Sequence, residues 1–146
     1  MGQRVAYTLD STLDSVNKAE ETADSLAQKA GFAEDDRHKI AMSVREAAVN
    51  AVLHGNSYDP HKTITVEYEM TTEKMSIVIT DQGVGLDQQG LPDPLAEENL
   101  LKSSGRGIFL IRSFMDEVRI RDLNPGTEIT LVKHVSAPTD AQGELK

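Results

Sequence analysis

The sequence predicts a two-layer α/β (α+β) sandwich in which a mixed, mostly antiparallel sheet carries three main helices on one face. Three observations favour this class. Segments with alternating apolar residues occur near both ends of the chain, two pairs of them are joined by tight turns, and long helix-periodic segments lie between them. A tight turn can join only antiparallel neighbours, and each helix must bury its apolar face against a second layer.

The first half of the chain is expected to form one strand and two helices. Alternating apolar side chains predict a strand over residues 4–9. A helix start is indicated at Ser11, and Gly31 is typical of the end of that helix. The acidic run at residues 34–36 suits the N-terminus of a second helix, which we expect to continue to about His54.

The second half is expected to form two hairpins and one more helix. Alternation over residues 64–79, with a turn at 71–74, predicts the first hairpin. The long stretch at residues 86–104 is unusual for a compact domain, and such stretches are typically functional. A third helix is expected to begin at residues 105–107, and the last hairpin to turn at 124–126.

Length and composition indicate one globular domain, which we place at residues 1–134, with residues 135–146 as a flexible tail. The 146 residues are 38% hydrophobic and 27% charged, which argues against a disordered chain. There is no cysteine, so disulfides, thiolate metal sites and a cysteine nucleophile are excluded. No apolar run approaches the roughly 20 residues of a membrane span, and the start does not resemble a signal peptide. We therefore expect a cytoplasmic protein with no membrane attachment.

The charge is unevenly distributed. The formal net charge is −9, which argues against direct binding of nucleic acid. Residues 10–36 contain eight acidic and two basic residues, whereas residues 101–122 contain five basic and three acidic ones. A basic stretch inside an acidic protein favours a small anionic ligand.

The second predicted helix carries a polar stripe. Ser43, Glu46, Asn50 and His54 lie within about 80° of one another on a helix that is apolar on several other sides. One interpretation is a hydrogen-bonded stripe that faces a loop. The other is a cleft in which Asn50 offers an oxygen to a hard cation and Glu46 acts as a base.

A second motif, Asp81-Gln82-Gly83-Val84-Gly85, directly follows a predicted strand. Glycines at these positions let the backbone approach a flat ligand, and the Asp81 carboxylate can accept a hydrogen bond from its edge. An exocyclic amine suits this acceptor, so adenine is favoured over guanine. The alternative interpretation is an ordinary turn.

A third motif, Ser103-Ser104-Gly105-Arg106-Gly107, lies at the predicted start of the third helix. Free backbone N–H groups at a helix N-terminus, with Lys102 and Arg106 nearby, describe a phosphate site. The alternative is a glycine-rich helix start without a ligand. The sequence contains no P-loop, and its four histidines have no metal-ligand spacing, which argues against zinc.

Together with Gly126-Thr127, these motifs follow one another in an order that resembles the N, G1 and G2 boxes and the final Gly-Thr of the GHKL (Bergerat-fold) ATP-binding superfamily. The runs EAAVNAVLHGN, SGRGIFLIRSFMDEV and PGTEITLVKH are most similar to bacterial anti-sigma factor serine/threonine kinases. The resemblance extends from about Val5 to His134. It implies a sandwich that binds ATP and Mg²⁺ under a lid at about residues 86–104.

The resemblance also implies roles for individual residues. Glu46 resembles the catalytic base, and Asn50 the single protein ligand of Mg²⁺. Asp81 would bind the adenine amine, supported by Thr127 through a water molecule, while Gly83 and Gly85 would let the base lie close. The residues expected around the phosphates are Lys102, Ser104, Gly105, Arg106 and Gly107.

The function implied by the resemblance is transfer of the ATP γ-phosphate to a serine or threonine of a STAS-type anti-sigma antagonist, which regulates a sigma factor. The family also suggests a homodimer. An alternative is a nucleotide-binding interaction module that holds a sigma factor without significant kinase activity. A detached sensor histidine kinase is disfavoured, because the ATP-binding fold leaves no room for a phosphoacceptor helix pair.

Overall fold

The computed structural model describes residues 2–55, 59–83, 107–123 and 126–135. The elements follow the order expected from the sequence: β1 (Gln3–Asp10), α1 (Leu13–Lys29), α2 (Glu34–Val49), the π-helix η1 (Asn50–Gly55), β2 (Thr63–Met70), β3 (Lys74–Thr80), α4 (Gly107–Phe114), β4 (Glu117–Asp122) and β5 (Thr127–His134). No helix in the described residues is long and apolar enough to cross a membrane.

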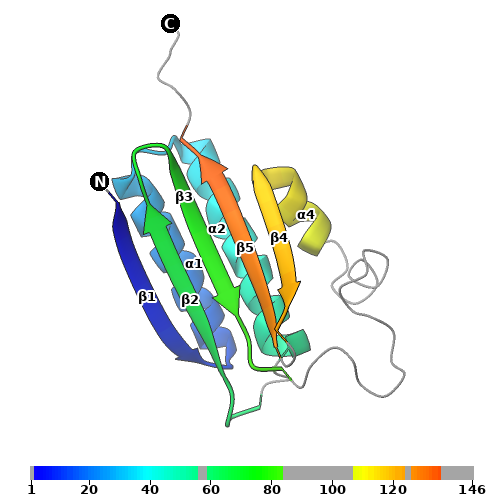
Figure 1. Cartoon of the computed structure of the whole chain (residues 1–146). Helices are drawn as coiled ribbons and strands as arrows, with labels where there is room; N and C mark the ends of the chain where they lie inside the picture. The colour runs from blue at the N-terminus through cyan, green and yellow to red at the C-terminus, as the bar shows by residue number, and fades with distance from the viewer. Residues whose placement is uncertain (1, 56–58, 84–106, 124–125, 136–146) are drawn as a thin grey trace, which may run out of the picture.

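The five strands form one sheet in the order β1-β2-β3-β5-β4. All four pairings are antiparallel, so the described strands contain no parallel pair. The helices α1, α2 and α4 cover one face of this sheet (Figure 1). The predicted two-layer fold with helices on one face is confirmed.

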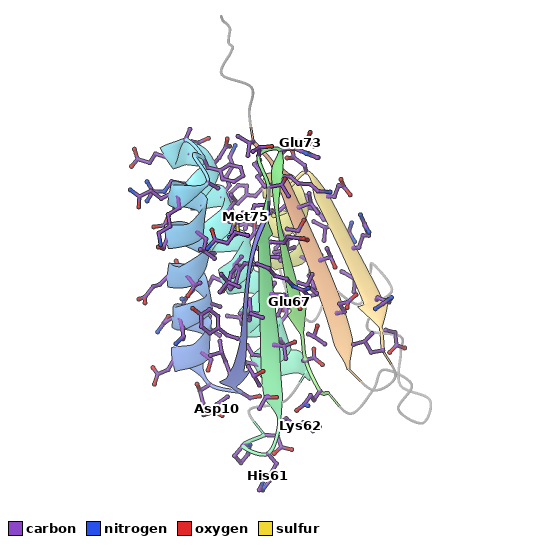
Figure 2. The ribbon with its side chains drawn as sticks, turned by 60° about the vertical axis from the view of Figure 1, so that its left-hand side comes forward. Asp10, His61, Lys62, Glu67, Glu73 and Met75 are labelled. Carbon is purple, nitrogen blue, oxygen red and sulfur yellow. The ribbon has the colours of Figure 1, made fainter. Side chains whose placement is uncertain are left out.

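Alternation along the central strands separates the core from the open face. Met75, Ile77 and Ile79 of β3 are at most 1% exposed, and they lie on the helix side of the sheet. Figure 2 shows Met75 near the helices and Glu67 of β2 on the other side. One face of the sheet is therefore apolar and covered, and the other is polar, as expected for a two-layer antiparallel sandwich.

Helix α1 packs closely on the sheet and on α2 because its buried face is rich in small residues. Ala19, Ala23 and Ala27 are at most 1% exposed. The hydroxyl of the buried Tyr68 donates to the Ala19 carbonyl oxygen at 2.9 Å, which satisfies its polar end. Burial raises the pKa of Tyr68, so its phenol stays neutral.

The start of α1 differs by one residue from the sequence-based expectation. Thr12 is the N-cap, and its side chain accepts from the Ser15 backbone N–H at 3.2 Å. The hydroxyl of Ser11 instead donates to the Lys62 carbonyl oxygen at 2.9 Å, which ties this turn to the segment before β2.

The second helix also differs from the expectation. Its α-helical winding ends at Val49, and Asn50–Gly55 continue as a π-helix. Wider π-helical turns are rare and are frequently found at functional sites. The helical segment thus reaches the expected end near His54, but with a different winding from Asn50 onward.

Candidate nucleotide site

Three elements bring the predicted site residues to one end of the molecule. Asp81 directly follows β3, Thr127 begins β5, and Asn50 begins η1. In Figure 1, the end of β3, the start of β5 and η1 all lie at the same end of the sandwich. Glu46 lies one helical turn before Asn50 on α2.

Asp81 is held in a single orientation by backbone donors. Its Oδ1 accepts from the Gly83 N–H at 2.9 Å and from the Thr127 N–H at 3.1 Å. Its own N–H donates to the Thr127 carbonyl oxygen at 3.0 Å. Both donors bind the same carboxylate oxygen, and no hydrogen bond from a described residue reaches Oδ2, which can therefore accept from a ligand.

Asp81 is 6% exposed as a residue, so the charge of its carboxylate carries a desolvation penalty. Burial raises the pKa of Asp81, and the N–H groups of Gly83 and Thr127 and the nearby charge of Lys62 partly oppose this shift. Figure 2 shows Lys62 at the same end of the sheet. A buried carboxylate with one uncommitted oxygen is a strong acceptor for a donor on a flat ligand.

Gly126 makes this arrangement possible, and the sequence analysis did not place it among the site residues. Its φ is +97°, a conformation that residues with a side chain rarely adopt. A Cβ at this position would lie 2.5 Å from the Asp81 carbonyl oxygen. The Pro125-Gly126 turn signal was visible in the sequence, but the close approach to Asp81 was not.

Gln82 helps the chain leave the sheet after β3. Its side-chain Oε1 accepts from the Thr63 backbone N–H at 2.8 Å. The β2–β3 ladder pairs Thr65 with Thr80, and beyond it Asp81 turns toward Thr127 of β5. The Thr63 N–H, beyond the last β2–β3 pair, is therefore satisfied by the side-chain oxygen of Gln82, while Asp81 bonds to Thr127 of β5.

Asn50 carries a second feature that indicates a ligand. Its Nδ2 is buried and has no hydrogen-bond partner among the described residues. A buried unpaired donor costs about 1–3 kcal/mol, so it requires a physical reason. Ser43 Oγ, two turns earlier on α2, is likewise unpaired in the described part of the chain, and nothing in the structure explains it.

Glu46 is half-buried on α2, and no partner of its carboxylate is found within the described ranges. Those same ranges hold no cluster of three or more potential His, Asp or Glu metal ligands. Mg²⁺ bound through one amide oxygen, phosphate oxygens and water does not need such a cluster. The residue types at the end of α2 therefore fit a magnesium-nucleotide complex.

The phosphate side of the predicted site is described only in part. Gly107 is the first residue of α4. Gly85, Lys102, Ser104, Gly105 and Arg106 lie outside the described residues, as does the predicted lid at 86–104. The close approach of the base at Gly85 and the phosphate contacts of the other four residues remain predictions.

Two surface hollows formed by the described residues lie away from these side chains. One, of about 390 Å³, lies between α1 and α2 and is lined by residues that include Glu20, Asp24 and Arg37. The other, of about 300 Å³, lies on the open face of the sheet beside Thr65 and Val78. The hydrogen bonding of Asp81, rather than a closed cavity, marks the candidate site.

Comparison with known families decides the identity of this fold. Residues 9–133 match the family described as the histidine kinase-like ATPase domain. The chain belongs to this family. Its strand-end aspartate and the Asn50 at the end of α2 are therefore found in an ATPase-type domain, as the GHKL resemblance implied.

Several known proteins are similar to this chain along most of their length. The serine-protein kinase RsbW of Staphylococcus aureus is 31% identical over 121 residues, which cover 78% of this chain and 76% of that protein. RsbW of Bacillus licheniformis is 29% identical, with 79% and 75% covered. The anti-sigma F factor of Geobacillus kaustophilus is 31% identical over 105 residues, with 70% and 72% covered.

A solved structure confirms the fold. The structure of the RsbU and RsbW domains of a Mycobacterium tuberculosis protein aligns with a TM-score of 0.65 at 19% identity. The alignment covers 93% of this chain and 33% of that longer protein. At this identity the likeness supports the fold assignment alone.

Proposed function

We propose that this protein is an ATP-dependent serine/threonine protein kinase that phosphorylates an anti-sigma antagonist of the STAS type and thereby regulates a sigma factor. The observation that carries the proposal is the Asp81 carboxylate, which is fixed through Oδ1 and whose Oδ2 accepts no hydrogen bond from the described residues. Similarity to serine-protein kinases and to an anti-sigma F factor supports the choice of substrate class.

Adenine recognition follows from the Asp81 geometry. The exocyclic amine of adenine donates to Oδ2, whereas the carbonyl of guanine at the equivalent position would face a carboxylate oxygen and be repelled. Thr127 would support the base through water, and the contact of its backbone N–H with Asp81 supports this role. Gly83, with its buried backbone, leaves room for the ring.

The triphosphate would extend from this end toward α2 and the start of α4. Asn50 would hold Mg²⁺ through its amide oxygen, and the ion would neutralise phosphate charge. The glycine-rich segment that leads into Gly107 would receive the phosphates at the N-terminus of α4. Lys102, Ser104, Gly105 and Arg106 belong to the same proposed phosphate contacts.

The transfer itself needs one proton acceptor. The hydroxyl oxygen of the target serine or threonine forms a bond to the γ-phosphorus, the bond from this phosphorus to the bridging oxygen breaks, and ADP leaves. The Glu46 carboxylate takes the hydroxyl proton. The position of Glu46 one turn before Asn50 supports this role, because it would put the proton acceptor near the proposed metal ligand.

A phosphotransfer assay with a matched control tests this proposal. Wild-type protein is incubated with radiolabelled ATP and purified candidate antagonists, alongside Glu46→Gln and Glu73→Gln. Glu73 lies in the hairpin turn before β3, at the opposite end of the sheet from Lys62. We expect Glu46→Gln to bind ATP normally but to lower label transfer about 100-fold, because a positioned general base contributes that order of rate. Glu73→Gln should transfer label as wild type does.

Two other outcomes have distinct meanings. Transfer that survives in Glu46→Gln would remove Glu46 from its proposed role while leaving the kinase activity intact. ATP binding without transfer to any antagonist would favour the nucleotide-binding interaction module. Sedimentation of the wild-type protein would test the homodimer that the family resemblance suggests.

A further inference from the structure

Lys133, near the end of β5, joins three elements through one side chain. The side chain is 12% exposed. Its Nζ donates to the Phe114 carbonyl oxygen at 2.8 Å and lies 3.9 Å from Oδ1 of Asp36. Phe114 ends α4 and Asp36 lies in the first turn of α2, so β5 is linked to two helices at once.

Both partners of Lys133 favour a cation. The last carbonyl groups of a helix have no partner within the helix and carry partial negative charge. Phe114 O is one of these groups. Asp36 adds a full negative charge that is itself only 19% exposed. Without the ammonium group, this carboxylate would have no ion-pair partner among the described residues.

The position of α4 along its own axis depends on directional contacts. Eight residues are too few to form a stable helix alone, so tertiary contacts hold α4 in place. Ile108 and Ile111 bury the apolar side of the helix, but apolar contacts have no preferred direction and allow sliding. The hydrogen bond from Lys133 is directional and fixes the C-terminal end.

Movement at one end of a short helix is transmitted to the other. In Figure 1, the C-terminal end of α4 points toward the end of the molecule where β5 finishes. Its first residue, Gly107, is where the proposed function places the phosphates. A shift of α4 along its axis would change the distance from Gly107 to the nucleotide without disturbing Asp81.

We propose that Lys133 is a positioning residue that anchors the C-terminal end of α4 and thereby sets its N-terminus against the β- and γ-phosphates of ATP. This inference rests on the proposed function. The same strand β5 holds Asp81 through Thr127 at its start and α4 through Lys133 near its end. A single strand therefore determines the relative placement of the base-binding and phosphate-binding parts of the site.

Calorimetric titration with ATP and with AMP tests the inference, because AMP shares the adenine contacts but lacks the two outer phosphates. Lys133→Met keeps the apolar stem and removes the charge and the donor. We expect it to weaken ATP binding about tenfold, the equivalent of one charge-assisted hydrogen bond, and to change AMP binding less than about twofold. Lys133→Arg, which can still donate to Phe114 O, should recover most of the ATP affinity.

Lys74→Met is the matched control, because Lys74 is an exposed lysine at the start of the neighbouring strand β3. It should bind both nucleotides as wild type does. If Lys133→Met does not fold, Asp36→Asn provides a second variant, since it removes one partner of the ammonium group and should weaken ATP binding selectively by about threefold. Thermal denaturation of every variant verifies that titrations are made on folded protein.

The outcomes separate the inference from the proposed function. Wild-type protein that does not bind ATP would overturn both. If the wild-type protein binds ATP, two results in the folded Lys133→Met or Asp36→Asn variant would overturn the inference alone. One is an equal loss of ATP and AMP affinity, and the other is no change in either. A selective loss of ATP affinity that Lys133→Arg restores would support it, because a general loss of stability does not distinguish the two nucleotides.

Discussion

The two halves of the candidate site are built in different ways. The base-binding half consists of strand ends, where backbone groups of Gly83 and Thr127 fix the Asp81 carboxylate before any ligand arrives. The catalytic half consists of helix ends, where Asn50 Nδ2 and the Glu46 carboxylate have no partner among the described residues. Asp81, which we propose binds adenine, is therefore held in place before a ligand binds, whereas Asn50 and Glu46, which we propose for metal binding and catalysis, would gain partners from the nucleotide and the metal.

Changes to the preformed half should have the largest effect, because it is part of the folded structure. Gly126→Ala introduces a Cβ that would lie 2.5 Å from the Asp81 carbonyl oxygen at a φ of +97°. We expect a loss of about 3 kcal/mol in the free energy of unfolding, together with weaker ATP binding. Urea denaturation and calorimetry measure the two effects. Gly31→Ala is the control, since Gly31 has a similar φ of +92° but nothing within 4 Å of its added Cβ.

If Gly126→Ala and Gly31→Ala destabilised the protein equally, the conformation of Gly126 rather than its contact with Asp81 would explain the loss. A larger effect at Gly126 that also weakens ATP binding would confirm that the two strand ends form one unit.

Changes to the catalytic half should affect the metal response and leave the fold intact. In Asn50→Ala we expect the ratio of ATP dissociation constants without and with Mg²⁺ to fall to about one, because the protein ligand of the ion is removed. The free energy of unfolding should change little compared with this loss of the magnesium response, because the substitution also removes a buried donor that has no partner in the described residues.

Titration with ATP in EDTA and in excess Mg²⁺ measures this ratio. Asn17→Ala is the control, because Asn17 is an exposed asparagine on α1 that accepts from Arg45. An undiminished magnesium response in Asn50→Ala would place the metal ligand elsewhere.

The smallest effect concerns stability and pH. Burial raises the pKa of Asp81 in the folded state, so the ionised carboxylate opposes folding at neutral pH. This cost develops as the pH rises from the ordinary pKa of an unfolded aspartate, about 3.9, through the raised folded value. Asp81→Asn should therefore have a higher Tm than wild type at pH 7, and the difference should disappear toward pH 4 and below. Thermal denaturation at several pH values measures it.

The sequence predicts the fold well where the pattern is local. Alternation from Ile64 to Met70, followed by the turn at 71–74, is sufficient to predict the β2–β3 hairpin. The end of α1 before Gly31 is also local, because its φ of +92° suits glycine.

The remaining features depend on contacts between distant residues or on winding that has no local signal. Ser11 and Thr12 are both residue types that cap helices, but the Ser11 hydroxyl instead donates to the carbonyl oxygen of Lys62, 51 residues away, a contact that the local sequence does not signal. Nothing in the residues after Val49 signals a π-helix. The insertion of β5 between β3 and β4 is likewise tertiary, and it is this insertion that brings Gly126 and Thr127 to Asp81.

The same distinction applies to the candidate site. Asp81, Asn50 and Glu46 were found because their residue types and spacing resemble family motifs. Gly126 belongs to the Gly126-Thr127 motif, but the sequence assigns it no role and does not single out Lys133, because a glycine in a turn and a lysine in a strand acquire a role only from neighbours in space.

The most direct test of the account is whether substitution of Asp81 changes the preference of the protein for ATP over GTP. Because Oδ1 accepts from two N–H groups, Asp81→Asn should keep its amide oxygen there and turn its Nδ2 toward the ligand, where a donor would meet the adenine amine. Calorimetric titration of the folded variant should show ATP affinity lowered at least about 100-fold and GTP affinity raised relative to ATP affinity. The control Asp10→Asn, at the same end of the sheet, should bind both nucleotides as the wild-type protein does. ATP affinity equal to that of wild type would contradict the assignment of Asp81 as the adenine acceptor.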